Sequence, residues 1–169
     1  MNNAVLISIK PKWCELIASG EKSIEVRKTG PKAERPFKCY IYCTKDGADS
    51  ATHFYECADG SWWDDGKTYS AFLSGYVIGE FTCDWCEQYI PCRTDFAELS
   101  AGSLVEPKEL YEYAKGKPLY GWHISDLKIY EEMKPLESLK RWEESGMWAH
   151  LLSITRPPQS WFYVEEVTE

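Results

Sequence analysis

Short runs of apolar residues, separated by Gly, Pro and polar positions, recur along the whole chain. The first run, residues 4–9, predicts a buried strand. Trp13, Leu16 and Ile17 then recur at helical spacing behind Pro11, whose fixed φ suits the first turn of a helix. Similar runs predict strands over residues 23–27, 38–44, 76–87, 120–130 and 161–164, and short helices over residues 107–114 and 135–142.

This order of elements predicts an α+β fold on a mostly antiparallel, barrel-like sheet with short flanking helices. Gly79 lies inside a predicted strand and indicates a bulge or a close backbone approach. We find no repeat and no linker, so residues 1–169 are expected to form one domain. Residues 46–75 are long for a connection and are interpreted as an insertion that is locally ordered or functional.

Charge is spread unevenly. The net charge of −8 argues against broad, sequence-independent adhesion to nucleic acid. Residues 1–45, however, carry nine Lys or Arg against four Glu, which predicts a small positive site on an acidic body. No apolar run approaches the roughly 18 residues of a membrane span, and the N-terminus lacks the pattern of a signal peptide. We therefore expect a cytoplasmic protein without a membrane partner.

The most informative segment is the run Gly-x-Lys-x-x-Glu-x-Arg, formed by Gly20, Lys22, Glu25 and Arg27. Gly20 is a natural left-handed terminator of the preceding helix. Glu25 and Arg27 share one face of a strand with their backbones about 7 Å apart. Their side chains can frame a polar ligand, or they can form a structural ion pair on an exposed sheet face.

Further candidates extend this site. Tyr40 and Tyr42 on the next strand offer a stacking surface for a base. The rigid Pro-Pro step before Gln159 suits the rim of a pocket, although Trp161 equally suits a packing role. The candidate ligand-binding residues are Lys10, Lys22, Glu25, Arg27, Tyr42, Lys45, Gln159 and Trp161.

Residues 8–11 and the motif of residues 20–27 together resemble the signature of ASCH domains, which belong to the PUA-like group. Residues 77–81 look like a later strand of that family, and the tail at residues 156–165 is similar to ASCH proteins of phages and prophages. The resemblance implies a PUA-like β-barrel whose ligand cleft is lined by the motif. It also implies that RNA or a nucleotide is the partner.

A branch of that family hydrolyses the amide of 4-acetylcytidine with a lysine, a threonine and a downstream glutamate. Lys22 matches the lysine, whereas Glu25 occupies the position of the threonine. Either Glu106 or Glu109 is a candidate for the downstream acid. Lys22 and Glu25 are thus the candidate catalytic residues of an amidohydrolase or a ribonuclease, and the sequence leaves open whether the protein is an enzyme.

Two other features of the sequence suggest different functions. Cys83 and Cys86 have the spacing of a zinc-binding pair, but a second close pair is missing, and Cys92, Cys57 or His53 would have to complete the site from elsewhere. We therefore expect no metal and no cofactor, and ordinary thiols at the seven cysteines.

A phage-encoded protein-interaction module would instead show an acidic face built from residues 46–75 and 131–144.

Overall fold

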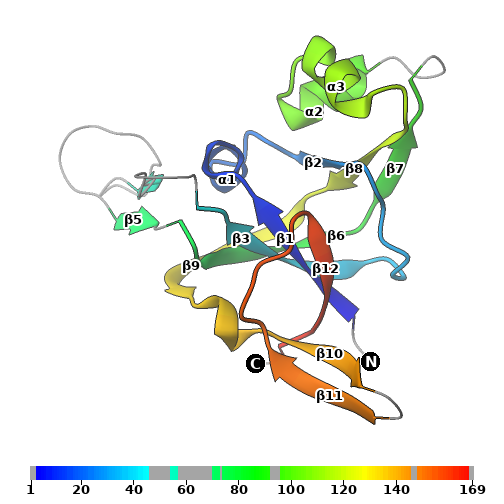
Figure 1. Ribbon diagram of the computed structural model, residues 1–169. Helices are drawn as coiled ribbons and strands as arrows, with labels where there is room; N and C mark the ends of the chain where they lie inside the picture. The colour runs from blue at the N-terminus through cyan, green and yellow to red at the C-terminus, as the bar shows by residue number, and fades with distance from the viewer. Residues whose placement is uncertain are drawn as a thin grey trace.

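The computed structural model describes residues 3–45, 54–56, 70–72, 74–91, 96–145 and 148–167. Figure 1 shows the arrangement of the elements. The first half contains β1 (Asn3–Ile9), α1 (Pro11–Ala18), β2 (Ile24–Arg27), β3 (Phe37–Cys43), β4 (Phe54–Glu56), β5 (Ser70–Phe72), β6 (Val77–Cys83) and β7 (Cys86–Tyr89). The second half contains α2 (Ala97–Ser103), α3 (Pro107–Ala114), β8 (Leu119–His123), β9 (Ser125–Lys134), the 3-10 turn η1 (Leu136–Ser138), β10 (Lys140–Ser145), β11 (Trp148–Ser153) and β12 (Trp161–Glu165).

The largest sheet has the strand order β12-β1-β3-β6-β9. Strands β1 and β3 are parallel, and the other neighbours are antiparallel. Strand β1 is buried on both faces because its side chains alternate between two apolar clusters. Val5, Ile7 and Ile9 pack into one cluster, and Ala4 and Leu6 pack into the other. A strand covered on both sides explains the continuous apolar run at the start of the chain.

A second sheet has the order β2-β8-β7 and carries α2 and α3 beside it (Figure 1). The chain passes between the sheets at two neighbouring points, residues 84–85 and Ile124. His123 donates its backbone N–H to the Trp85 carbonyl at 2.9 Å, and Ile124 donates to Ser23 at 2.9 Å. These bonds hold the corner at which β6 continues as β7 and β8 continues as β9.

The expected α+β class and mostly antiparallel sheet are confirmed. The expected barrel is not: within the residues that the structure describes, the strand pairings form open sheets and do not close a ring. β12 and β9 are the edges of the larger sheet, and β2 and β7 are the edges of the smaller one.

Three boundaries differ from the sequence prediction. The runs 76–87 and 120–130 are each divided into two strands by the corner. The predicted helix 135–142 is only the turn η1, after which the chain enters β10. Leu136 and Leu139 are both buried, and their spacing of three fits a 3-10 turn as well as an α-helix.

Much of the proposed insertion lies outside the described residues, including its Trp62–Trp63 pair. Its described part contains the antiparallel pair β4 and β5. The assignment of residues 1–169 to one domain stays a prediction. No helix among the described residues is long and apolar enough to cross a membrane, and the cytoplasmic location likewise stays a prediction.

Gly79 is confirmed as a point of close backbone approach. A Cβ at this position would lie 2.5 Å from the backbone oxygen of Lys128 on the neighbouring strand β9. The pairing registers shift on both sides of β6 next to this glycine. Gly20 has φ +78°, but a Cβ there would meet nothing within 4 Å.

These two glycines allow a comparison of backbone crowding with backbone conformation. We expect Gly79→Ala to lower the free energy of unfolding by about 2 kcal/mol or more, because β6 and β9 must separate. Gly20→Ala should cost about 1 kcal/mol, because only the left-handed conformation opposes it. Urea unfolding of both variants checks this order, and an equal or smaller loss at Gly79 would contradict it.

Candidate functional site

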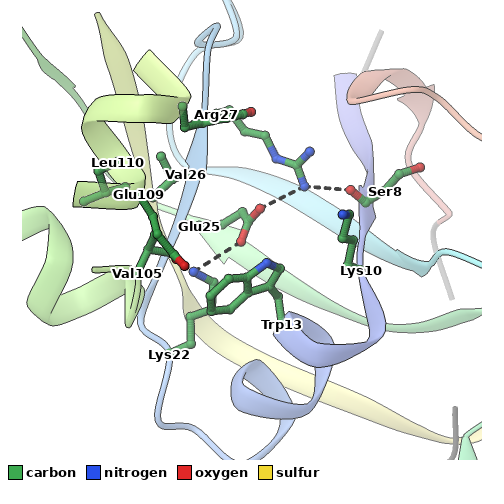
Figure 2. Close-up of a pocket in the computed structure, with 11 residues that line it drawn as sticks. Ser8, Lys10, Trp13, Lys22, Glu25, Val26, Arg27, Val105, Glu109 and Leu110 are labelled. Atoms are coloured by element: carbon green, nitrogen blue, oxygen red, sulfur yellow. Dashed lines mark hydrogen bonds and ion pairs between the residues drawn. The ribbon is translucent and has the colours of Figure 1, made fainter. Parts of the chain in front are cut away.

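A cavity of about 310 Å³ lies where the end of β1, helix α1, strand β2 and helix α3 meet (Figure 2). Its polar lining comes from Ser8, Lys10, Lys22, Glu25, Arg27 and Glu109. Its apolar and aromatic lining comes from Trp13, Val26, Val105, Leu110 and Tyr113. The volume is at the lower end of the roughly 300–1,000 Å³ typical of small-molecule sites. The cavity is therefore large enough for one small polar ligand.

The loop after α1 directs Lys22 inward. Gly20, in the left-handed conformation, donates its N–H to the Ile17 carbonyl at 2.9 Å. The Lys22 N–H then donates to the Leu16 carbonyl at 2.8 Å, which holds the loop against the end of the helix. The predicted role of Gly20 as a left-handed terminator is confirmed.

Alternation along β2 divides its side chains between two environments. Ile24 packs into an apolar cluster with Leu99 of α2 and Leu110 of α3. Glu25 and Arg27 point to the opposite face, toward the end of β1 and α1 (Figure 2). One short strand thus anchors two helices with one face and presents the charged residues with the other.

Lys22, Glu25 and Arg27 form one connected cluster. Glu25 accepts a bond from Arg27, with Nη2 2.9 Å from Oε1, and its Oε2 lies 3.5 Å from the Lys22 Nζ. Arg27 Nη2 also donates to the Ser8 carbonyl at 2.7 Å, and Lys22 Nζ donates to the Ser103 carbonyl at 2.7 Å. The exposed fractions of Lys22, Glu25 and Arg27 are 2%, 6% and 8%, so they are not an ion pair on an exposed face.

The cluster buries two cations with one carboxylate. Burial lowers the pKa of the Lys22 ammonium below its ordinary value of 10.5, although the Glu25 carboxylate acts to raise it. The Arg27 Nε is buried and finds no acceptor among the described residues. A buried donor without an acceptor costs free energy, so the cluster is not optimised for stability alone.

Two aromatic side chains frame the cavity. The Lys22 Nζ lies 4.9 Å from the centre of the Trp13 ring, a distance at which the ring attracts the cation. Burial raises the pKa of the Tyr113 phenol, so that the hydroxyl is protonated and can donate a hydrogen bond at neutral pH. The cavity therefore combines charged groups with aromatic surface.

The structure brings together half of the predicted ligand-binding residues. Lys10, Lys22, Glu25 and Arg27 all line this cavity.

The other predicted ligand-binding residues lie elsewhere. Tyr42 and Lys45 line a separate hollow of about 590 Å³, because Tyr42 belongs to the cluster on the other face of the large sheet. Gln159 is exposed and lines neither hollow. Trp161 also lines neither, and it donates its Nε1 to the Thr29 hydroxyl at 3.0 Å and packs against Trp122. A ligand-binding role for these four residues stays a prediction.

Sequence reasoning named Glu109 of α3 as one of two candidate acids, but it missed Tyr113 of the same helix. Of the two candidate acids, Glu109 lines the cavity, whereas Glu106 is the residue before α3 and does not. Glu109 and Tyr113 are four residues apart, so they share one face of the helix. This spacing was visible in the predicted helix 107–114 and is the signal that could have placed Tyr113 beside Glu109.

The cysteines form no metal site in the part of the chain that the structure describes, where no group of three or more His, Cys, Asp or Glu could hold a metal ion. Cys83 is buried and donates to the Trp85 carbonyl at 3.3 Å, and Cys86 is half-buried. The other possible zinc ligands, Cys57, Cys92 and His53, lie outside the described residues.

The lowered pKa of Lys22 predicts a specific pH dependence. The unfolded chain holds the Lys22 proton more tightly than the folded protein, so the free energy of unfolding should rise with pH until 10.5. Lys22→Met removes this contribution. We expect the difference in the free energy of unfolding between the wild type and Lys22→Met to increase from neutral pH towards 10.5. Urea unfolding measures this difference. The exposed position of Lys117 provides a control, Lys117→Met, and a flat difference for Lys22→Met would contradict the assignment.

Comparison with known proteins links this architecture to a family of solved structures. No family model and no curated protein matches the chain. The crystal structure of ASCH from Zymomonas mobilis matches with a TM-score of 0.60 at 15% identity, covering 98% of this chain and 90% of that one. Two mutants of the same protein match with TM-scores of 0.63 and 0.59, both at 14% identity. They cover 98% and 96% of this chain and 90% and 91% of theirs.

These matches give no support to the resemblance to phage proteins, but they agree with the fold expected from the motif at residues 20–27. The chain therefore has an ASCH-like fold.

Proposed function

We propose that this protein binds RNA by taking one unpaired nucleotide into the cavity around Lys22, Glu25 and Arg27. Proteins with the ASCH-like fold are generally related to RNA binding, and this supports the class of partner. The cavity of about 310 Å³ suits a single nucleoside. It lies between helices and strands, where a rigid duplex cannot enter.

The observation that carries the proposal is that Arg27 is buried at the cavity with one hydrogen-bond donor that has no acceptor among the described residues. Arg27 is 8% exposed, lines the cavity and has an Nε without an acceptor among the described residues. A guanidinium presents a planar fork of donors that matches the acceptor atoms of a base or a phosphate. A ligand acceptor that reaches Nε would therefore remove an existing cost.

The charge pattern of the cavity favours a base over a phosphate. Lys10, Lys22 and Arg27 are accompanied by two carboxylates, Glu25 and Glu109. A phosphate would be attracted by the cations but repelled by the carboxylates. A base edge offers both acceptors and N–H donors, so it can pair with both kinds of group. Trp13 and Tyr113 place aromatic surface at the edge of this polar site.

Removal of the guanidinium tests this proposal. We expect Arg27→Gln to weaken binding of single-stranded RNA by about 10- to 100-fold, the usual effect of losing hydrogen bonds to a charged group. Arg156→Gln makes the same charge change at an exposed position outside the cavity and should leave binding unchanged. Fluorescence anisotropy measures both, and circular dichroism checks that Arg27→Gln remains folded. A folded Arg27→Gln protein with wild-type affinity would remove the assignment.

A second candidate function, amide hydrolysis of an acetylated nucleoside, is favoured by the contact between Lys22 and Glu25. Burial lowers the pKa of Lys22, which increases the fraction of neutral amine that can accept a proton. Glu109 lines the same cavity and supplies a second carboxylate. In such a reaction, water adds to the acetyl carbonyl, the C–N bond breaks, and the amine leaves with a proton as acetate is formed. A ribonuclease would use the cluster of Lys22, Glu25 and Arg27.

Incubation with 4-acetylcytidine tests the second candidate. If the cavity is catalytic, the wild type should release acetate and cytidine in equal amounts. Lys22→Met and Glu25→Gln should each reduce the rate by at least about 100-fold, the usual contribution of a proton-transferring side chain. Arg156→Gln should retain the wild-type rate. Chromatography measures the products, and unchanged 4-acetylcytidine after long incubation with the wild type would exclude this activity.

The third interpretation, a phage-encoded protein-interaction module, depends on an acidic face that includes residues 46–75. Because most of that segment lies outside the described residues, this interpretation stays a prediction.

A further inference from the structure

Both aromatic residues that line the cavity carry an exposed lysine on the ring. The Lys12 Nζ lies 4.6 Å from the centre of the Trp13 ring, and the Lys28 Nζ lies 4.4 Å from the centre of the Tyr113 ring. Lys12 and Trp13 belong to α1, Lys28 follows β2, and Tyr113 belongs to α3. The two pairs therefore come from separate elements that meet around the same cavity.

The two lysines differ from the charged residues inside the cavity. Lys22 is buried and bonded to Glu25 and Ser103. Lys12 and Lys28 are exposed, and neither forms an ion pair with a described residue. Their ammonium groups are consequently available to an anion from solution.

We infer that Trp13 with Lys12, and Tyr113 with Lys28, are stacking positions for the two nucleotides that flank the one in the cavity. The preferred ligand is then a single-stranded RNA segment of three nucleotides rather than a free nucleotide or a duplex. This inference rests on the proposed function of the cavity. It adds a length preference, and it assigns roles to two lysines outside the cavity lining.

Replacement of the lysine on each ring by a base should lower the free energy. A cation–π contact at an exposed site is weaker than stacking of a base on the same ring. When a base takes the ring face, the displaced ammonium stays within the reach of a lysine side chain and can meet the phosphate that joins two nucleotides. Inside the cavity, Glu25 and Glu109 offset the attraction of the cations for a phosphate, so we place the phosphates outside it, where these lysines lie.

Other exposed aromatic side chains near the cavity do not offer the same arrangement. Tyr111 on α3 stacks on Phe96, with the ring centres 4.5 Å apart, and it does not line the cavity. Trp85 lies at the corner between the sheets beside His123 and does not line the cavity. Among the described residues, Trp13 and Tyr113 are therefore the aromatic residues of the cavity lining that carry an exposed lysine without an ion pair.

Binding of ligands of different length tests the inference. The probes are the four nucleoside 5′-monophosphates, their homotrinucleotides, and the same trinucleotides with abasic outer positions, all measured by calorimetry. We expect the best trinucleotide to bind about tenfold or more tightly than its monophosphate, since each stacked base adds affinity. The abasic trinucleotide should lose most of this gain, because it retains the phosphates but not the stacking bases.

The double variant Lys12→Ala, Lys28→Ala isolates the two lysines. It should weaken trinucleotide binding by about tenfold and leave monophosphate binding within about twofold. The matched control is Lys134→Ala, Lys140→Ala, which removes the same charge. Lys134 also lies over a tyrosine ring, 4.2 Å from the centre of Tyr130, but outside this cavity. The control should retain wild-type affinity for both ligands.

The outcomes separate this inference from the proposed function. Monophosphates that bind as tightly as trinucleotides would overturn the three-nucleotide site and leave the cavity assignment intact. An equal loss in the control variant, or full affinity of the abasic trinucleotide, would also overturn it, because general charge attraction would then explain the length effect. Failure of every monophosphate and trinucleotide to bind the wild type would overturn the proposed function itself.

Discussion

The carboxylate of Glu25 is the interaction on which the site depends, because it is the group that joins the two buried cations. Through Arg27 it is linked to the Ser8 carbonyl of β1, and through Lys22 it is linked to the Ser103 carbonyl of α2. Buried ionic networks of this kind seldom add more stability than well-packed apolar residues of similar volume. Their concentration around a cavity therefore indicates a functional requirement more than a structural one.

Close packing on the opposite face of β2 makes this network possible. A Cβ at Gly102 would lie 2.5 Å from the Cδ1 of Ile24, so α2 approaches β2 closely only because this residue is glycine. The approach brings the Ser103 carbonyl, at the end of α2, within 2.7 Å of the Lys22 ammonium. The apolar face of β2 thus sets the position of the Ser103 carbonyl, and this carbonyl accepts the hydrogen bond from Lys22 on the charged side.

The local part of the site was predictable from the sequence, and the tertiary part was not. The spacing of Lys22, Glu25 and Arg27 lies within one loop and one short strand, so alternation alone places the last two on a common face. Tyr42 failed to join them because alternation along β3 cannot say which face of the large sheet adjoins the cavity. The strand breaks at residues 84–85 and Ile124 were missed for a related reason. They arise where two distant segments turn together from one sheet to the other, and neither carries a Pro or Gly signal.

The balance of charge limits what can bind here. Outside residues 1–45 the chain carries ten basic and twenty-three acidic residues, so a long nucleic acid lying across the surface would meet repulsion over most of its length. The cations around the cavity are few: Lys10, Lys22 and Arg27 line it, and Lys12 and Lys28 sit on its aromatic residues. Such a patch can neutralise only two or three phosphates. Affinity must then come mainly from stacking and from hydrogen bonds to bases, which weakly depend on salt. Under the proposed function, the protein would select short unpaired segments because the acidic remainder of its surface would repel a longer nucleic acid.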